Sequence, residues 1–435
     1  MLIFEGAFRR WILPGLADLF LLARDPICLA ALLLGSSLFF RSGWAKAFAA
    51  FGIFATFLAV TVGHGNLFGA AYGLRIYLFH FPLIFLFPLV FDRSDAWKFA
   101  KVMLFVAIPM TVLLGFQHYL PQTHWVNVGV GGTGSAGFGG ALGRFRPPGT
   151  FSFISGVSMF YPLCAALLAT MLLSGYRPIP KWMLLSVGAL AMALPLSISR
   201  AVGFSYILVG AGTLAGGGLS PRQMGRIVGG VLLVSLVALV VANTGTFQDS
   251  MKAFSARWEG ANEYEGKEEG AVGALRYRTV EWMGDDLNRA LERASILGVG
   301  LGSGTSGGAK LIAGKKGLKF GEGEWGILLF ELGLLLGFAV IFTRLALAFY
   351  LLSRAVAQAR RGNGAAVPLA VLASYWMATA VSGQPTSLGF IVLAAGICLV
   401  MTKPSSPARP RIRSIAATRA ELAGVSRQDR APHLR

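Results

Sequence analysis

A long apolar helix begins in the stretch KFGEGEWGILLFELGLLLGF, residues 319–338. Glu322 and Glu324 stand at the start of this helix, and Glu331 lies well inside it. A charged group in the middle of a bilayer costs about 3 kcal/mol on insertion scales. If the helix crosses a membrane, each acid should therefore have a role that offsets this cost. It could cap the helix, pair with another buried polar group or form part of a binding site.

Apolar runs of this kind recur along most of the chain. Of the 435 residues, 55% are hydrophobic and only 14% are charged, and the mean hydropathy is +0.63. Runs of about 17–25 apolar residues are long enough to cross a bilayer. Most of these runs lack the polar face of a soluble helix and the alternation of barrel strands. The sequence therefore predicts an all-α, polytopic transmembrane helix bundle.

We expect about twelve spans in a single transmembrane domain, residues 1–402, followed by a basic, disordered cytoplasmic tail, residues 403–435. A long external segment with short helices, residues 246–323, should separate the ninth span from the tenth. The first span is short and could be re-entrant. The expected spans are 11–24, 26–40, 44–63, 66–91, 97–119, 150–174, 181–199, 201–217, 225–243, 324–352, 366–383 and 386–402.

The distribution of charge predicts the orientation of the chain. A net charge of +19 would suit nucleic-acid binding, but the basic residues lie mostly in short loops and in the tail. Cytoplasmic loops of membrane proteins carry such an excess of Lys and Arg. With the tail inside, the short basic loops all fall inside, so we expect both termini in the cytoplasm and no nucleic-acid partner. These loops are 41–46, 175–181, 218–226 and 353–364.

Arginines on the predicted external side are unusual, because positive residues normally stay inside. They come from three segments: Arg144 and Arg146, Arg200, and Arg276 and Arg278. Each could simply lie at the interface or form a surface salt bridge. The planar fork of arginine, however, binds phosphate oxygens through two parallel hydrogen bonds. The pattern favours binding of a lipid diphosphate, and the scattered Cys and His residues predict no metal or other cofactor.

The acids at the helix start then gain a candidate role. A carboxylate buried at a membrane edge has a raised pKa and can act as a base on an acceptor hydroxyl. Helix capping by Glu322 and Glu324 is the alternative. We expect Glu331 to be buried and paired with a polar group, an arginine being one candidate. His118 and His124, on the external side, are alternative bases.

These residues resemble the O-antigen ligase and polysaccharide polymerase superfamily of bacterial envelope enzymes. The resemblance covers roughly residues 140–400, and the order and common side of the motifs carry it. A further stretch, FEGAFRRWILP (4–14), is similar to a motif in a subset of these proteins. The matching motifs are RFRPPGTFSF (144–153), SISRAVG (197–203), RTVEWMGDDLNRALERASILGVGLGSG (278–304) and EGEWGILLFELGLLLGF (322–338).

The resemblance implies a glycosyltransferase of the bacterial inner membrane with its active site on the external face. It would transfer a sugar chain from a polyprenyl-diphosphate-linked oligosaccharide to a second lipid-linked glycan during exopolysaccharide or O-antigen synthesis. Its partners would be the bilayer and other polysaccharide assembly and export proteins. Together with the arginines and acids described above, the resemblance leads us to expect Glu322, Arg200 and Arg278 to be catalytic and Arg146, Arg276, Glu324 and His124 to bind substrate.

One departure from the family pattern concerns the choice between polymerase and ligase. Family ligases usually begin this helix with histidine and then asparagine, where this chain has Glu322 and Gly323. This difference favours the polymerase over a ligase that joins a finished glycan to a lipid core. A transporter of a lipid-linked or anionic glycan is the alternative of another class. It should have broken helices in two related halves, and no internal repeat is evident.

Overall fold

The computed structural model of the chain is mostly helical, as the sequence predicts. Its only strands in the described part form a two-stranded antiparallel hairpin, β1 (Phe138–Gly139) and β2 (Phe145–Arg146). The described residues from Met1 to Thr402 form one unit. The described residues are 1–35, 41–135, 137–178, 180–218, 221–265, 273, 282–314 and 323–403.

Six stretches of helix in the described part are long and apolar enough to cross a membrane. The twelve spans expected from the sequence stay a prediction. The six are α4 (Gly43–Thr61), α5 to α6 (Leu67–Val90), α7 (Arg93–Tyr119), α8 (Ile154–Ser174), α11 (Pro221–Ala242) and α16 (Glu324–Arg360). Within Leu67–Val90, α5 (Leu67–Arg75) and α6 (Phe81–Val90) are joined by the π-turn η4 (Ile76–His80).

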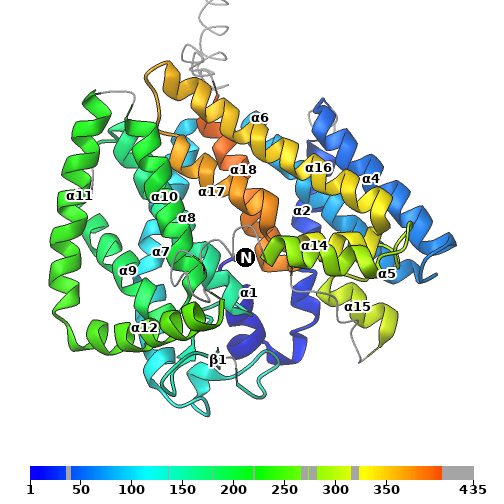
Figure 1. Ribbon diagram of the computed structural model, residues 1–435, viewed down its shortest axis with the longest axis horizontal. Helices are drawn as coiled ribbons and strands as arrows, with labels where there is room; N and C mark the ends of the chain where they lie inside the picture. Colours follow the sequence, from blue (N-terminus) through cyan, green and yellow to red (C-terminus); the bar gives the residue numbers. More distant parts are fainter. Residues whose placement is uncertain are drawn as a thin grey trace, which may run out of the picture. The chain divides into compact units, whose positions relative to one another are not determined.

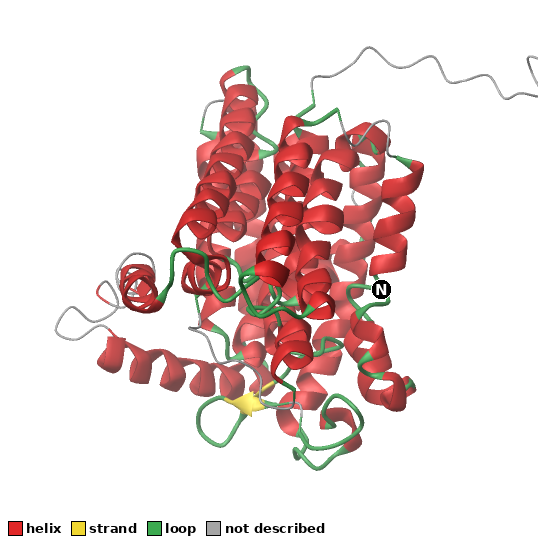
Figure 2. Cartoon of the chain, turned by 90° about the vertical axis from the view of Figure 1, so that its right-hand side faces the viewer, coloured by secondary structure: helices red, strands yellow, loops and turns green. Residues whose placement is uncertain are grey.

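Shorter helices complete the bundle and its loops (Figure 1). Those of the bundle are α2 (Asp25–Leu34), α9 (Met183–Ser197), α10 (Arg200–Gly217), α17 (Val367–Thr379) and α18 (Pro385–Met401). The segment 246–323 contributes α12 (Gly245–Glu265), α14 (Trp282–Arg293) and α15 (Ser306–Ala313) in its described part. Figure 2 shows the hairpin and α12 at one end of the bundle.

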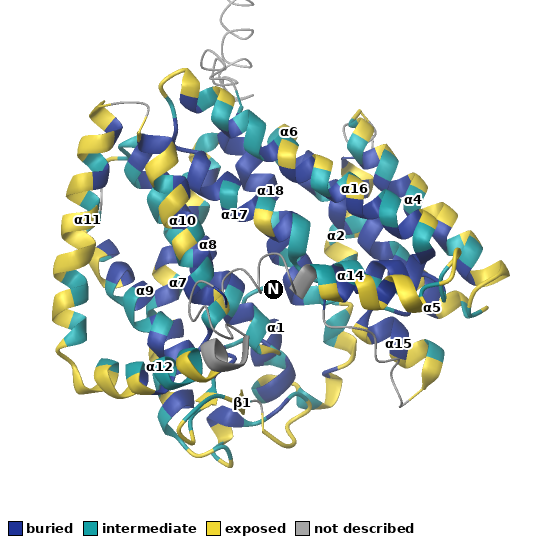
Figure 3. Ribbon diagram, in the orientation of Figure 1, coloured by how far each residue is buried: buried dark blue, intermediate teal, exposed yellow. Residues whose placement is uncertain are grey.

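Burial separates a central group of helices from the outer ones. Figure 3 shows α17 and α18 largely buried, whereas α11 is exposed along most of its length. Only 11% of the residues in the apolar part of α11 are buried. An exposed helix of this apolarity is suited to contact with lipid. The helices are therefore consistent with a membrane protein.

The expected first span, residues 11–24, does not form. The chain instead makes α1 (Glu5–Ala7) and the short turns η1 (Phe8–Ile12), η2 (Pro14–Leu16) and η3 (Leu19–Leu21). Pro14 lacks the N–H that a continuing helix needs, and its ring clashes with the preceding turn. The apolar composition of this segment predicted a span, although Pro14 breaks the helix.

The N-terminal segment, residues 1–24, lies at the hairpin end of the bundle. Arg10 donates hydrogen bonds to the carbonyls of Val126 and Val128, in the loop between α7 and α8. The end of α18 lies at the other end, where Met401 and Arg93 line the same cavity. On which side of a membrane each terminus lies stays a prediction from the sequence.

Candidate functional site

The long helix α16 is interrupted at Gly333, which has a positive φ of 76°. This conformation is open to glycine and costly for other residues. The glycine-rich loop GVGLGSG, residues 298–304, fills the interruption. Val299 donates its N–H to the carbonyl of Phe330 at 3.1 Å, and Gly300 donates to that of Glu331 at 2.9 Å. The loop thus satisfies carbonyls that the break leaves free.

Glu331 binds the same loop through its side chain. Its carboxylate is buried and accepts the N–H of Gly302 at 2.5 Å. The expectation of a buried, polar-paired Glu331 is confirmed. The arginine partner is wrong, because the backbone of the loop supplies the donor. Glu331 therefore ties the loop of residues 298–304 to α16.

Glu324 is not open to a substrate, contrary to the substrate contact expected from the sequence. Its side chain is 1% exposed and forms an ion pair with Arg344. Ser382 donates its N–H to the carboxylate at 2.9 Å. Arg344 in turn donates to the carbonyl of Met377 at 2.8 Å. A buried charge pair is tolerated only when its remaining polar atoms are bonded in this way, so Glu324 holds α16 against the turn before α18.

The cap of α16 comes from another segment. Asp286 of α14 is buried and accepts the N–H of Gly326 in the first turn of α16, at 2.9 Å. The helix N-terminus favours such a negative charge. The N-cap residue, Gly323, has no side chain for this purpose. Capping by the acids of the helix itself, the alternative reading of the sequence, is therefore not how Glu324 is used.

Three of the site residues expected from the sequence lie outside the described residues. They are Glu322, Arg276 and Arg278. The proposed base and two of the proposed phosphate ligands therefore stay predictions from the sequence.

The hairpin carries Arg146 and fixes its neighbours. Arg146 lies on β2 and pairs in register with Phe138 of β1. The guanidinium of Arg144 lies 4.7 Å from the ring centre of Tyr119, a cation–π distance. Arg257 of α12 donates to the carbonyl of Gly139 at 3.3 Å. The hairpin therefore joins α12 to the end of α7.

Arg200 begins α10 beside this hairpin. A Cβ added to Gly140 of the hairpin would come within 3.0 Å of the Ile198 side chain. Ser199, at the N-cap of α10, shares a hydrogen bond of 3.0 Å with Ser158 of α8. We call the four residues of these adjoining elements the hairpin arginines: Arg144, Arg146, Arg200 and Arg257.

An apolar groove of about 600 Å³ runs between α9, α10 and α12. Gly203 of α10 makes room for it, since Phe254 and Trp258 of α12 lie opposite that glycine. The rings of Phe254 and Trp258 are 5.7 Å apart. The other apolar lining residues are Leu194, Tyr206, Ile207 and Met251, and Ser255 and Glu259 of α12 are the polar ones. The groove begins one helical turn from Arg200.

The two candidate histidines serve local structure. His118 is buried, within hydrogen-bond distance of the carbonyl of Leu196 at 3.2 Å. His124 is half-buried, and its Nδ1 accepts the N–H of Val126 at 3.3 Å, which caps the turn η5 (Trp125–Asn127). His124 can still reach solvent, whereas His118 cannot.

A charged network in the N-terminal segment was missed at the sequence level. The buried carboxylate of Glu5 lies 3.5 Å from Arg9 and 3.2 Å from Arg24. Arg10 is 1% exposed and bonds only carbonyl oxygens in the described part, among them that of Gly149 at 2.9 Å. Burial lowers the pKa of Arg10 to about 10, which leaves it charged at neutral pH. The motif FEGAFRRWILP was the available signal.

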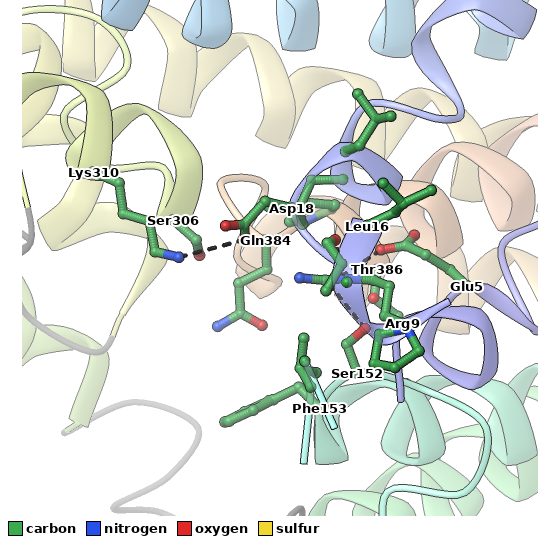
Figure 4. Close-up of a pocket in the computed structure, with 18 of the residues that line it drawn as sticks. Glu5, Arg9, Leu16, Asp18, Ser152, Phe153, Ser306, Lys310, Gln384 and Thr386 are labelled. Atoms are coloured by element: carbon green, nitrogen blue, oxygen red, sulfur yellow. Dashed lines mark hydrogen bonds and ion pairs between the residues drawn. The ribbon is translucent and has the colours of Figure 1, made fainter. Parts of the chain in front are cut away.

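The same segment borders a polar cavity of about 760 Å³. Its other walls are the loop residues Val130 and Gly131 and the starts of α8, α15 and α18 (Figure 4). Figure 4 shows Gln384 between the side chains of α15 and those of the N-terminal segment. The polar lining residues are Glu5, Arg9, Asp18, Ser152, Ser155, Ser306, Lys310, Gln384 and Thr386.

Comparison with known proteins adds no relative. No model of a known protein family matches the chain, and a search of curated proteins gives no match. The resemblance to the O-antigen ligase and polysaccharide polymerase superfamily therefore rests on the motifs themselves. The function has to follow from the chemistry at the hairpin end of the bundle.

Proposed function

We propose that the protein is a membrane glycosyltransferase of the polysaccharide polymerase type. It would take its donor from a polyprenyl-diphosphate-linked glycan and extend a second lipid-linked glycan during exopolysaccharide or O-antigen synthesis. The observation that carries the proposal is the hairpin arginines beside the apolar groove. Arg200 and Gly203 are three residues apart on α10, so they lie on one side of the helix. A lipid with an anionic head and an apolar tail matches that pair of features.

The arginines would act on the leaving group. In the transfer, the bond between the anomeric carbon of the donor sugar and the diphosphate oxygen breaks, and the diphosphate leaves with the electron pair. The acceptor hydroxyl oxygen forms the new glycosidic bond and gives its proton to a base. Preorganised guanidinium groups stabilise the charge that develops on the diphosphate. We assign the base to Glu322, the carboxylate that stands where family ligases have a histidine.

The orientation follows from the positive-inside rule. Arg93, Arg222 and Arg226 line a cavity at the end opposite the hairpin, beside Gly362. An excess of such residues marks the cytoplasmic side. We therefore propose a bacterial inner-membrane protein whose hairpin end is external and whose C-terminal tail is cytoplasmic. The N-terminal segment then lies outside, which revises the orientation expected from the sequence.

Transport is the second candidate, because α16 is broken at Gly333 and transporters bind substrates at broken helices. In α16, however, carbonyls at the break accept hydrogen bonds from residues 298–304 of the same chain. A substrate would have to displace that loop. The break in α16 therefore serves to anchor this loop and does not form a substrate site. Ligation to a lipid core shares the proposed donor site and differs only in the acceptor.

Donor binding tests the proposal directly. The purified protein in lipid nanodiscs should bind undecaprenyl diphosphate more tightly than undecaprenol, because only the former offers phosphate oxygens. Arg200→Ala should weaken diphosphate binding about tenfold or more, a charge-assisted hydrogen bond being worth about 1.5–3 kcal/mol. Arg222→Ala, an exposed arginine at the other end, is the matched control. If the protein bound both lipids equally, or if both variants bound undecaprenyl diphosphate equally, the donor site would be refuted.

A further inference from the structure

We propose that the polar cavity beside the N-terminal segment binds uncharged sugar residues of the acceptor glycan. This inference rests on the proposed function and names where the second substrate lies. The cavity volume of about 760 Å³ falls in the range of about 300–1,000 Å³ for small-molecule sites. Its walls come from five separate parts of the chain, so the fold builds the cavity.

The charges of the cavity cancel. Its four charged side chains are two acids and two bases, and they pair across the lining. Arg9 lies 3.5 Å from Glu5, and Lys310 lies 3.7 Å from Asp18. Paired charges leave little net field for an anion. The cavity therefore differs from the hairpin end, where Arg144, Arg146, Arg200 and Arg257 lie on adjoining elements.

The remaining polar groups suit sugar hydroxyls. Serine and threonine hydroxyls and the glutamine amide both donate and accept hydrogen bonds, as sugar hydroxyls do. The Oγ of Ser155 is buried and has no hydrogen-bond partner in the described part of the chain. A buried polar atom without a partner is costly, so a ligand hydroxyl there would be favoured. Phe153, 38% exposed, offers an apolar face for the ring carbons of a sugar.

The cavity adjoins the proposed donor site through aromatic residues. The ring of Phe153, at the cavity, contacts that of Phe138 with centroids 4.6 Å apart. Phe138 is the register partner of Arg146 in the hairpin. A glycan that fills the cavity could therefore extend along the hairpin toward the diphosphate. The N-terminal segment would then be part of the acceptor site.

The test is the binding of saccharides by the full chain in nanodiscs, measured by calorimetry. The neutral probes are maltotetraose, cellotetraose and mannotetraose, and the anionic probe is tetragalacturonate. At least one neutral probe should bind more tightly than the anionic one. Ser306→Trp, which fills the cavity from an exposed position, should abolish this binding. Ser94→Trp, exposed at the other end of the bundle, is the matched control and should bind as the unmodified protein does.

A smaller substitution gives a second measurement that does not rely on filling the cavity with a large side chain. Ser155→Ala should weaken binding of the best neutral probe about threefold to tenfold, as expected for one lost hydrogen bond. No saccharide binding, preference for tetragalacturonate, or unchanged binding by Ser306→Trp would each overturn the inference. Loss of diphosphate binding is a separate outcome. It would refute the donor site while leaving the saccharide measurement interpretable.

Discussion

Glu324 and Arg344 form an ion pair inside the bundle, and its role can be separated from catalysis. Arg344→Ala would leave the buried carboxylate unpaired, which typically costs about 3–5 kcal/mol. The double variant Glu324→Met with Arg344→Met should recover most of that stability, because no charge stays buried. Thermal unfolding in detergent measures both. A single variant as stable as the unmodified protein would show that the pair contributes nothing.

Glu322 is expected to behave in the opposite way, since it is assigned to chemistry. Glu322→Gln keeps the size of the side chain and removes the base, so transfer should slow by about 100- to 10,000-fold. The unfolding temperature should stay unchanged. Glycan transfer by the purified variant in lipid, next to its melting curve, provides the comparison. Normal turnover would remove Glu322 from the mechanism and leave His124 as the next base to examine.

At the scale of elements, the break in α16 is the feature most easily tested. Gly333→Ala places a side chain at positive φ, which costs about 1–2 kcal/mol, and its Cβ would overlap the backbone of Leu297 and Gly298. We expect a lower unfolding temperature and faster proteolysis within residues 295–305. Gly210→Ala in α10, where a Cβ meets nothing, is the control and should be neutral or stabilising. Equal protease resistance would mean that the loop is held by other contacts.

The elements also show what the sequence could and could not predict. Apolar length alone predicted α7, α8 and α16 to within several residues, because a span needs little else. It failed for residues 11–24, where Pro14 interrupts the helix, and it did not predict that the charges just before this stretch are buried against distant loops. It also missed Arg344, which lies in an apolar run and is 20 residues from Glu324. Partners of buried charges depend on packing, and no spacing rule within one helix predicts them.

At the scale of the whole molecule, the side of the membrane on which the N-terminal segment lies distinguishes the proposed orientation from the one expected from the sequence. Single cysteines at Gly15, Gly139 and Gly362 can be placed in a variant whose native cysteines are replaced by serine. An impermeant maleimide added to intact cells should label the first two, since the N-terminal segment and the hairpin lie at one end. Position 362 should react only after the cells are opened. Labelling of Gly362 from outside, or protection of Gly15, would contradict the proposed orientation.

The central claim is that the hairpin end transfers glycan from a lipid diphosphate, and one reconstitution tests it most directly. The purified protein in proteoliposomes receives the undecaprenyl-diphosphate-linked repeat unit, and polymer length and released undecaprenyl diphosphate are measured together. We predict longer glycans with one diphosphate lipid released per bond formed, a loss of both with Arg200→Ala, and incomplete recovery with Arg200→Lys, whose point charge lacks the bidentate fork. Unchanged glycan length in the unmodified protein, or full turnover by Arg200→Ala, would contradict the account.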